Sequence, residues 1–146
     1  MIVFDASVLI AYLDGEDAQH HKAESMLARE IDDDFAANPL TFAEVLVGPS
    51  RTGRLDAARS ALRGLEIAEQ PFPADTAVRL ARLRADTGLR MPDCCVLLAA
   101  QDAAARLATF DERLVRGAQD LGLDALRARR ARPRHRCASA GVRGGT

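Results

Sequence analysis

Short apolar runs alternate with longer amphipathic segments along this 146-residue chain. The first run, residues 1–4, is wholly apolar and stops at Asp5, which is the pattern of a short buried strand. The segment VLIAYLD then predicts a helix that Ser7 caps and that ends near Gly15. Further short strands are predicted over 66–72, 106–110 and 123–126.

Apolar and small residues at helical spacing predict more helices between these strands. They are expected over 17–30, 41–47, 54–65, 75–88, 92–105 and 111–122. Gly48 is expected to end the second of them, and 32–40 is expected to be a loop broken at Pro39. The buried face of the segment 75–88 is expected to carry Val78, Leu80, Ala81 and Leu83. Strands separated by helices predict a three-layer α/β/α sandwich with a mainly parallel central sheet.

The composition is that of an ordinary globular domain, because 48% of the residues are hydrophobic and 28% are charged. No apolar run approaches the roughly 20 residues that span a bilayer, and the first residues lack the basic stretch of a signal peptide. Cys94 and Cys95 are adjacent and Cys137 is distant, so they predict neither a disulfide framework nor a C-x-x-C zinc site. A reducing cytoplasm is the expected location.

Charge divides the chain at about residue 126. Residues 127–146 hold seven of the 20 basic residues and none of the 21 acidic ones, so the rest of the chain carries a net charge of −8. We therefore expect one domain over 1–126 and an arginine-rich, flexible tail over 127–146. The tail could hold RNA phosphates, or it could be a low-complexity extension with no specific role.

Four carboxylates share one kind of position, the start of a predicted helix. Asp5 follows the first strand, and Glu44 lies early in the helix over 41–47. Asp93 and Asp111 each begin a later helix. In a parallel sheet these junctions lie at the carboxyl edge, where functional groups collect. Four like charges there would raise one another's pKa values, and a divalent cation resolves that conflict. With oxygen ligands alone, Mg²⁺ or Mn²⁺ is favoured over zinc.

Each acid also has a purely structural interpretation, which the residues alone leave open. TFAE at 41–44 and TFDE at 109–112 match the capping box, in which the glutamate needs no metal. Asp5 can cap the helix that starts just after it, and Asp93 directly after Pro92 is a good N-cap. Asp111 is favourable at the positive end of a helix dipole. A bound Mg²⁺ would instead hold phosphate oxygens and activate water for attack on phosphorus. No P-loop and no G-x-G-x-x-G motif supports the use of nucleotides.

Four blocks resemble, in order and spacing, the sequences of PIN-domain ribonucleases: VFDASVLIAYL, TFAEVLVGPSR, MPDCCVLLAA and LATFDERL. Over about residues 1–126 the chain is most similar to VapC-type toxins of toxin–antitoxin modules. The resemblance implies a Mg²⁺- or Mn²⁺-dependent endoribonuclease that acts on tRNA or other structured RNA. It also implies a homodimer that is neutralised by a small antitoxin protein, which inserts a peptide segment into the active-site groove.

The resemblance further implies roles for individual residues. The acidic positions of the family, catalytic and metal-binding, match Asp5, Glu44, Asp93 and Asp111. Small hydroxyl residues beside them match Ser7 and Thr109, which are suited to orienting carboxylates through hydrogen bonds. Arg51 lies where the family often has basic residues, which implies a contact with RNA.

Two other functions stay open on the residues alone. A non-catalytic α/β module, either receiver-like or a degenerate PIN domain, would bind a metal without turning over RNA. A phosphatase with an aspartyl nucleophile would need a second Asp two residues after Asp5, where this chain has Ser7. His20 and His21 lie on a polar helix face, and we expect them to be solvated rather than to bind a metal.

Overall fold

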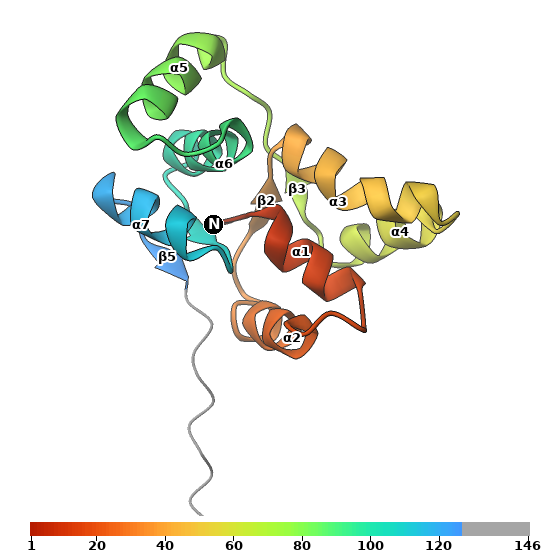
Figure 1. Cartoon of the computed structure of the whole chain (residues 1–146). Coiled ribbons are helices and arrows are strands. Elements are labelled where there is room, and N and C mark those ends of the chain that lie inside the picture. Colours follow the sequence, from red (N-terminus) through yellow and green to blue (C-terminus); the bar gives the residue numbers. More distant parts are fainter. Residues whose placement is uncertain (127–146) are drawn as a thin grey trace, which may run out of the picture.

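Parallel strands form the centre of the computed structural model, which describes residues 1–126 (Figure 1). The expected tail, 127–146, lies outside the described residues. The strands are β1 (Ile2–Phe4), β2 (Phe35–Ala37), β3 (Ala68–Glu69), β4 (Arg106–Ala108) and β5 (Ala125–Leu126). They form one sheet in the order β3-β2-β1-β4-β5, and every pairing is parallel.

Helices connect successive strands and cover both faces of the sheet. They are α1 (Ala6–Leu13), α2 (His20–Arg29), α3 (Pro39–Arg51), α4 (Leu55–Gly64), α5 (Thr76–Thr87), α6 (Met91–Asp102) and α7 (Glu112–Asp120). None of the helices in the described part of the chain is both long and apolar enough to cross a membrane.

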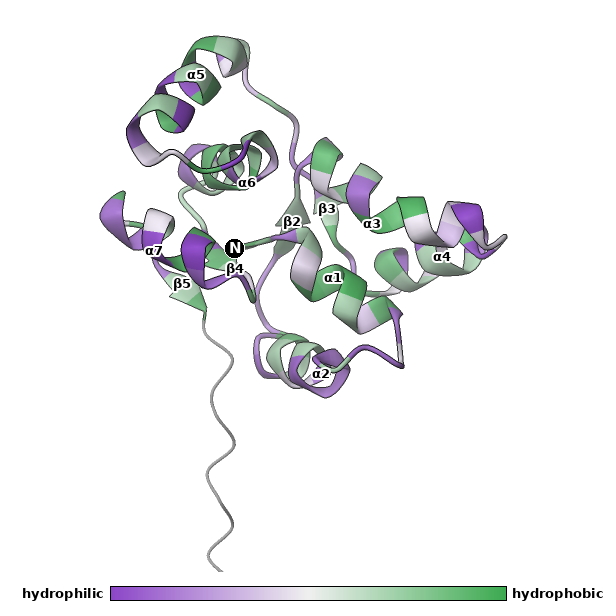
Figure 2. Cartoon of the chain, in the orientation of Figure 1, coloured by the Kyte–Doolittle hydropathy of each residue, from purple (hydrophilic) through white to green (hydrophobic). Residues whose placement is uncertain are grey.

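The two faces of the sheet carry separate hydrophobic cores, because successive side chains of a strand point to opposite sides. Ile2 and Phe4 of β1 pack into a core with α1, α2, α3 and α4. Val3 points the other way and packs into a core with α5, α6 and α7. Figure 1 shows these two groups of helices on opposite sides of the strands, and Figure 2 shows hydrophobic residues along the strands and along α6. The predicted α/β/α sandwich is confirmed.

Helix α6 lies in the most apolar surroundings. Every residue from Asp93 to Ala100 is buried, as its nearly uniform apolar character predicts. The adjacent cysteines, Cys94 and Cys95, are free and buried, and burial raises the pKa of both thiols. They pack as small hydrophobic residues.

Two expectations about the elements were wrong, and a third was only partly confirmed. The expected loop over 32–40 contains the buried strand β2, which is too short to show a period in the sequence. Helix α3 continues through Gly48 to Arg51, and the left-handed backbone conformation comes later, at Gly53 with φ of 70°. The strand expected over 66–72 is present, but it has only the two exposed residues of β3.

The predicted inner face of the helix over 75–88 is only partly correct. Leu83 is buried and Leu80 is partly buried, but Val78 is 55% exposed and Ala81 is also exposed. The end of this helix is confirmed, since Gly88 adopts the left-handed conformation with φ of 66°. That conformation strongly favours glycine at the C-cap.

Candidate active site

The strands β1, β2 and β4 end at the same edge of the sheet, with their carboxyl ends aligned. The register pairs the last residue of β1 with the last residue of β4, and β2 ends level with them. The next residues along the chain are Asn38 after β2, Asp5 after β1 and Thr109 after β4. These three residues therefore leave the sheet side by side at its carboxyl edge.

The order of the strands reverses between β1 and β4. The chain moves outward from β1 through β2 to β3, and then returns to the other side of β1 to form β4 and β5. In open α/β sheets, ligands bind beyond the carboxyl ends of the strands at such a switch point. Asp5 and Thr109 stand on the two sides of this switch point.

Hydrogen bonds hold the Asp5 carboxylate across the switch point. Its Oδ2 atom accepts from Ser7 Oγ at 2.6 Å, from the Ser7 backbone N–H at 3.4 Å and from Thr109 Oγ1 at 2.8 Å. The Asp5 backbone N–H donates to the Ala108 carbonyl at 2.9 Å, which continues the ladder beyond the strands. Within the described part of the chain no hydrogen bond reaches Asp5 Oδ1, so this oxygen is available to a ligand.

Each hydroxyl in this network donates one hydrogen bond and accepts another. Ser7 Oγ accepts from the Phe110 backbone N–H at 3.1 Å, and Thr109 Oγ1 accepts from the Asp111 backbone N–H at 3.0 Å. The hydroxyl protons of Ser7 and Thr109 are therefore directed to Asp5, so both residues are suited to orienting its carboxylate. The expected capping role of Ser7 was wrong, because Asp5 itself is the N-cap of α1 and Ser7 supplies the capped N–H.

Glu44 lies in the second turn of α3 and is partly buried. The N-cap of α3 is Asn38, whose Oδ1 accepts from the Thr41 backbone N–H at 2.9 Å. The capping-box interpretation of Glu44 is therefore wrong. Burial raises the pKa of Glu44 above its ordinary value of 4.5, and the charges of Asp5 and Asp93 raise it further. Carboxylates from three separate elements thus act on one another.

Asp93 is buried in the first turn of α6, where its side chain is 10% exposed. The N-cap of this helix is Arg90, so the interpretation of Asp93 as an N-cap is wrong. The Arg90 Nε atom donates to Asp93 Oδ2 over a long distance of 3.4 Å. A carboxylate this buried normally has several hydrogen-bond partners, and Asp93 is short of them among the described residues.

Asp111 is the N-cap of α7, as one interpretation of the sequence predicts. Its Oδ1 accepts from the Arg113 backbone N–H at 2.8 Å. The capping box proposed for 109–112 is wrong, because the Thr109 hydroxyl serves Asp5 instead. The Asp111 backbone N–H donates to Thr109 Oγ1, which in turn donates to Asp5. The charge of Asp111 also raises the pKa of Arg90, the residue that donates to Asp93.

The four carboxylates fit a hydrated ion better than a dehydrated one. Among the described residues, no three of these carboxylates bring their oxygens within 4.8 Å of one another. An ion held directly by one or two of them would reach the others through water, which is how Mg²⁺ usually binds. The buried Asn38 Nδ2 has no hydrogen-bond partner among the described residues and follows β2 beside Asp5. A bound water would satisfy this donor.

The potential metal-ligand atoms of another group, His20, His21 and Glu24 on α2, do lie within 4.8 Å of one another. It lies at the other end of α1 from Asp5, since His20 Nδ1 is 2.9 Å from the Ala11 carbonyl. His21 and Glu24 are exposed, and hydrogen bonding to His21 lowers the pKa of Glu24. His21 is solvated as expected, whereas His20 is only 19% exposed.

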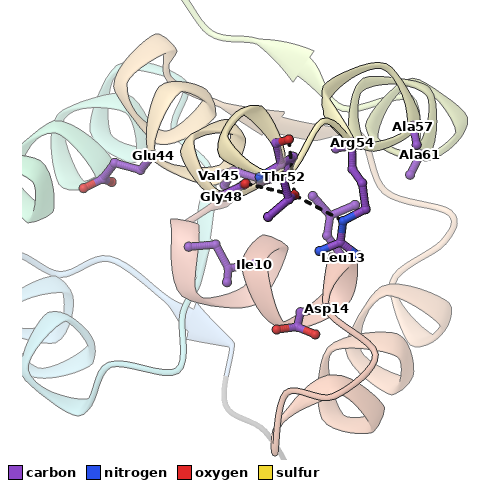
Figure 3. Close-up of a pocket in the computed structure, with 12 residues that line it drawn as sticks. Ile10, Leu13, Asp14, Glu44, Val45, Gly48, Thr52, Arg54, Ala57 and Ala61 are labelled. Atoms are coloured by element: carbon purple, nitrogen blue, oxygen red, sulfur yellow. Dashed lines mark hydrogen bonds between the residues drawn. The ribbon is translucent and has the colours of Figure 1, made fainter.

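A hollow of about 360 Å³ lies between α1, α3 and α4. Its wall is mostly apolar and includes Ile10, Leu13, Val45 and Ala58. Glu44 also lines it, and Figure 3 shows the Glu44 side chain extending away from the end at which Thr52 and Arg54 lie. The hollow thus joins the acidic edge of the sheet to an apolar groove.

Two arginines differ in their relation to the acids. Arg51 is the exposed last residue of α3, about 10 Å further along the helix axis than Glu44. Its contact with RNA stays a prediction. Arg90 acts on Asp93, Asp111 and Glu44 through its charge, yet our interpretation of the sequence passed over it. The available signal was the segment RMPD, which puts a cation three residues before Asp93.

These features define an α/β protein with a carboxylate site at the switch point of a parallel sheet. The family model for the PIN domain matches residues 2–119, and the chain belongs to this family. Members are generally nucleases and typically use divalent metal ions. A comparison with curated proteins found no match.

Several solved structures share the fold at low sequence identity. A toxin–antitoxin complex from Klebsiella pneumoniae has a TM-score of 0.72 and 23% identity, and the match covers 88% of this chain and 98% of that one. FitAcB from Neisseria gonorrhoeae has a TM-score of 0.66 and 17% identity, with the same two coverages. VapBC2 from Rickettsia felis, bound to a promoter DNA fragment, has a TM-score of 0.66 and 15% identity, and the match covers 86% of this chain and 98% of that one.

Proposed function

We propose that this protein is a metal-dependent endoribonuclease that hydrolyses phosphodiester bonds and acts as the toxin of a toxin–antitoxin pair. The observation that carries the proposal is the convergence of acids from different elements at the switch point, seen in the effect of Asp5 and Asp93 on the pKa of Glu44. Membership of the PIN domain family supports the nuclease chemistry. Structured RNA such as tRNA is the proposed substrate.

In this proposal Asp5 and Asp93 hold the ion most directly, and Glu44 and Asp111 complete the site directly or through water. A bound Mg²⁺, or Mn²⁺, would supply a Lewis acid for the phosphate and lower the pKa of an attacking water. Ser7 and Thr109 hold Asp5 in one orientation so that Oδ1 stays free for the ion. Glu44, with its raised pKa, is suited to accept a proton from water.

Substitution of Asp5 by Asn tests the site directly. The change keeps the shape of the side chain and its capping oxygen but removes the charge, so we expect RNA cleavage to fall at least a hundredfold while the protein stays folded. Cleavage of a labelled bacterial tRNA pool with Mg²⁺ and with Mn²⁺ is the measurement, and calorimetry reports metal binding. Asp32→Asn changes an exposed residue whose side chain has no hydrogen-bond partner within residues 1–126, and it is the matched control.

Full cleavage by Asp5→Asn would remove Asp5 from the site. Metal binding by the wild-type protein without turnover of any RNA would favour the non-catalytic binding module instead. Cleavage of DNA in preference to RNA would keep the nuclease but change its substrate.

The proposed partner is a small antitoxin whose peptide segment occupies the groove between α1, α3 and α4. The apolar wall of the 360 Å³ hollow suits apolar side chains, and its connection to Glu44 would bring the segment to the acids. Solved structures with this fold include toxin–antitoxin complexes. A small reading frame beside the gene, and a co-purifying protein of under about 100 residues, would support this partner. A homodimer is also proposed, and light scattering would measure it.

A further inference from the structure

Arg90 is a cation placed among the acids of the candidate active site. It is the N-cap of α6, directly before the turn that contains Asp93. Its charge acts on Asp93, Asp111 and Glu44, which are three of the four proposed ligands. Among the groups that shift the pKa of Glu44, Arg90 is the one that lowers it. The guanidinium is therefore close enough to these three carboxylates for its charge to act on each of them.

Among residues 1–126, most of the hydrogen-bonding capacity of Arg90 is unused. A guanidinium carries five N–H donors, and within this range the side chain makes one long bond, from Nε to Asp93 at 3.4 Å. The Arg90 side chain is 70% exposed, whereas that of Asp93 is 10% exposed. The terminal nitrogens are thus held near the acids by one anchored atom and remain open to a ligand. A fork of two such nitrogens matches two oxygens of a phosphate.

An RNA phosphate needs such a group at this site. One divalent ion offsets half of the four formal negative charges of Asp5, Glu44, Asp93 and Asp111, so a phosphate that approaches the ion still meets a net negative site. Arg90 offsets one more charge at the point where the phosphate must arrive. The described part of the chain has a net charge of −8, so its overall charge does not attract RNA and a local cation is needed at the site.

We propose that Arg90 binds the non-bridging oxygens of the RNA phosphate that is cleaved. This inference rests on the proposed ribonuclease function and adds a residue that contacts the substrate. Arg90 donates through its terminal nitrogens while Nε keeps its bond to Asp93, so the same side chain connects the phosphate to the metal-binding carboxylate.

A purely structural role is the alternative, in which Arg90 only holds Asp93 in place. The two roles differ in their effect on the metal. If Arg90 only positions Asp93, its loss weakens Mg²⁺ binding and cleavage together. If Arg90 binds the phosphate, its loss leaves Mg²⁺ affinity unchanged or tighter, because a competing positive charge has been removed, and RNA binding suffers instead.

The experiment compares Arg90→Gln, Arg90→Lys and the control Arg82→Gln, which changes an exposed arginine of α5 without an ion pair among the described residues. Calorimetry gives Mg²⁺ affinity, cleavage of a labelled tRNA pool gives the rate, and filter binding with Ca²⁺ in place of Mg²⁺ gives the dependence of RNA affinity on salt. For Arg90→Gln we expect at least a tenfold loss of cleavage and a salt slope smaller by about one. Arg90→Lys should restore the slope and part of the rate.

Each outcome decides the matter. Undiminished cleavage by Arg90→Gln, or Mg²⁺ affinity that falls in proportion to cleavage, overturns this inference and leaves the ribonuclease in place. A loss of cleavage in Arg82→Gln to the same extent would show that removal of any arginine has this effect, and would also overturn it. Failure of the wild-type protein to cleave RNA removes the proposed function and this inference together.

Discussion

Glu44 connects the stability of the protein with its proposed metal. Burial and the charges of Asp5 and Asp93 raise its pKa above 4.5. A carboxyl group with a raised pKa binds its proton more tightly in the folded state than in the unfolded state. Its contribution to stability is therefore fully present below pH 4.5 and is lost as the pH rises through the folded-state pKa. At neutral pH without metal, the charged Glu44 is a cost to folding.

Replacement of Glu44 by Gln should therefore stabilise the metal-free protein at neutral pH. Glutamine resembles the neutral form of the acid, so we expect a rise in Tm of about 2–4 °C at pH 7.5 in EDTA. The difference should shrink as the pH falls toward 4.5, and it should shrink or reverse when Mg²⁺ is added, because the ion stabilises the charged form in the wild type only. Thermal unfolding at a series of pH values, with and without Mg²⁺, measures it.

A lower Tm for Glu44→Gln in EDTA at pH 7.5 would contradict this account of the site. The same result from Glu112→Gln, an exposed glutamate of α7, would show a general effect of net charge. Glu112 is therefore the matched control.

At the scale of elements, the hydrogen bond from Thr109 to Asp5 joins the ends of β1 and β4 across 104 positions of sequence. Thr109 is 2% exposed, and its hydroxyl also accepts from the Asp111 backbone. One buried oxygen thus connects two proposed ligands and fixes the geometry of the switch point.

Thr109→Val should weaken both the fold and the activity, because it keeps the shape of the side chain but removes the hydroxyl. We expect a loss of about 1–3 kcal/mol in the free energy of unfolding, because the Asp111 N–H is left unpaired and Asp5 loses a donor. Cleavage should fall about 10- to 100-fold, as is usual when a group that orients a metal ligand is removed. Urea denaturation and the tRNA cleavage assay measure the two effects.

Thr109→Ser keeps the hydroxyl and is the matched comparison. It should retain most of the cleavage activity of the wild type. Equal behaviour of the valine and serine variants would show that the hydroxyl has no role in orienting Asp5.

The starts of the helices show what local patterns can and cannot predict. Asp111 does cap its helix, and Gly88 does end one, because both signals depend on neighbours within a few residues. The capping box at 41–44 was wrong because the helix begins earlier, at Pro39, and Asn38 already accepts from the Thr41 N–H that the Glu44 carboxylate would take. Element type was therefore easier to predict than the residue at which each element starts.

At the scale of the whole molecule, the sheet determines where the described chain ends. Leu126, the last described residue, is paired with Ala108 in the parallel register, so β5 ends at the same edge as Asp5 and Thr109. Neighbouring strands are about 4.8 Å apart, and an extended residue spans about 3.3 Å. A few residues therefore cover the distance from the end of β5 to the acids, and the segment 127–146 holds seven arginines.

Truncation after Leu126 should reduce both RNA affinity and its dependence on salt. Removal of each arginine–phosphate interaction lowers the salt slope by about 0.7 for single-stranded RNA, so we expect a decrease of at least one. Thermal unfolding should be unchanged. Filter binding at several salt concentrations is the measurement, and a full-length variant with the tail arginines replaced by glutamine separates charge from length. An unchanged slope would assign the tail no role in RNA binding.

The sequence by itself determined the order of most elements and singled out the four acids as the proposed site, because strand runs, helical periodicity and the blocks shared with the PIN domain family are local in the chain. The tertiary structure alone decided that Asp5 and Thr109 meet, that Asn38 stands beside them, and that Arg90 rather than a more obvious cation lies among the acids. These relations join residues far apart along the chain, and they depend on strand register and on the point at which strand order reverses. No local pattern contains that information.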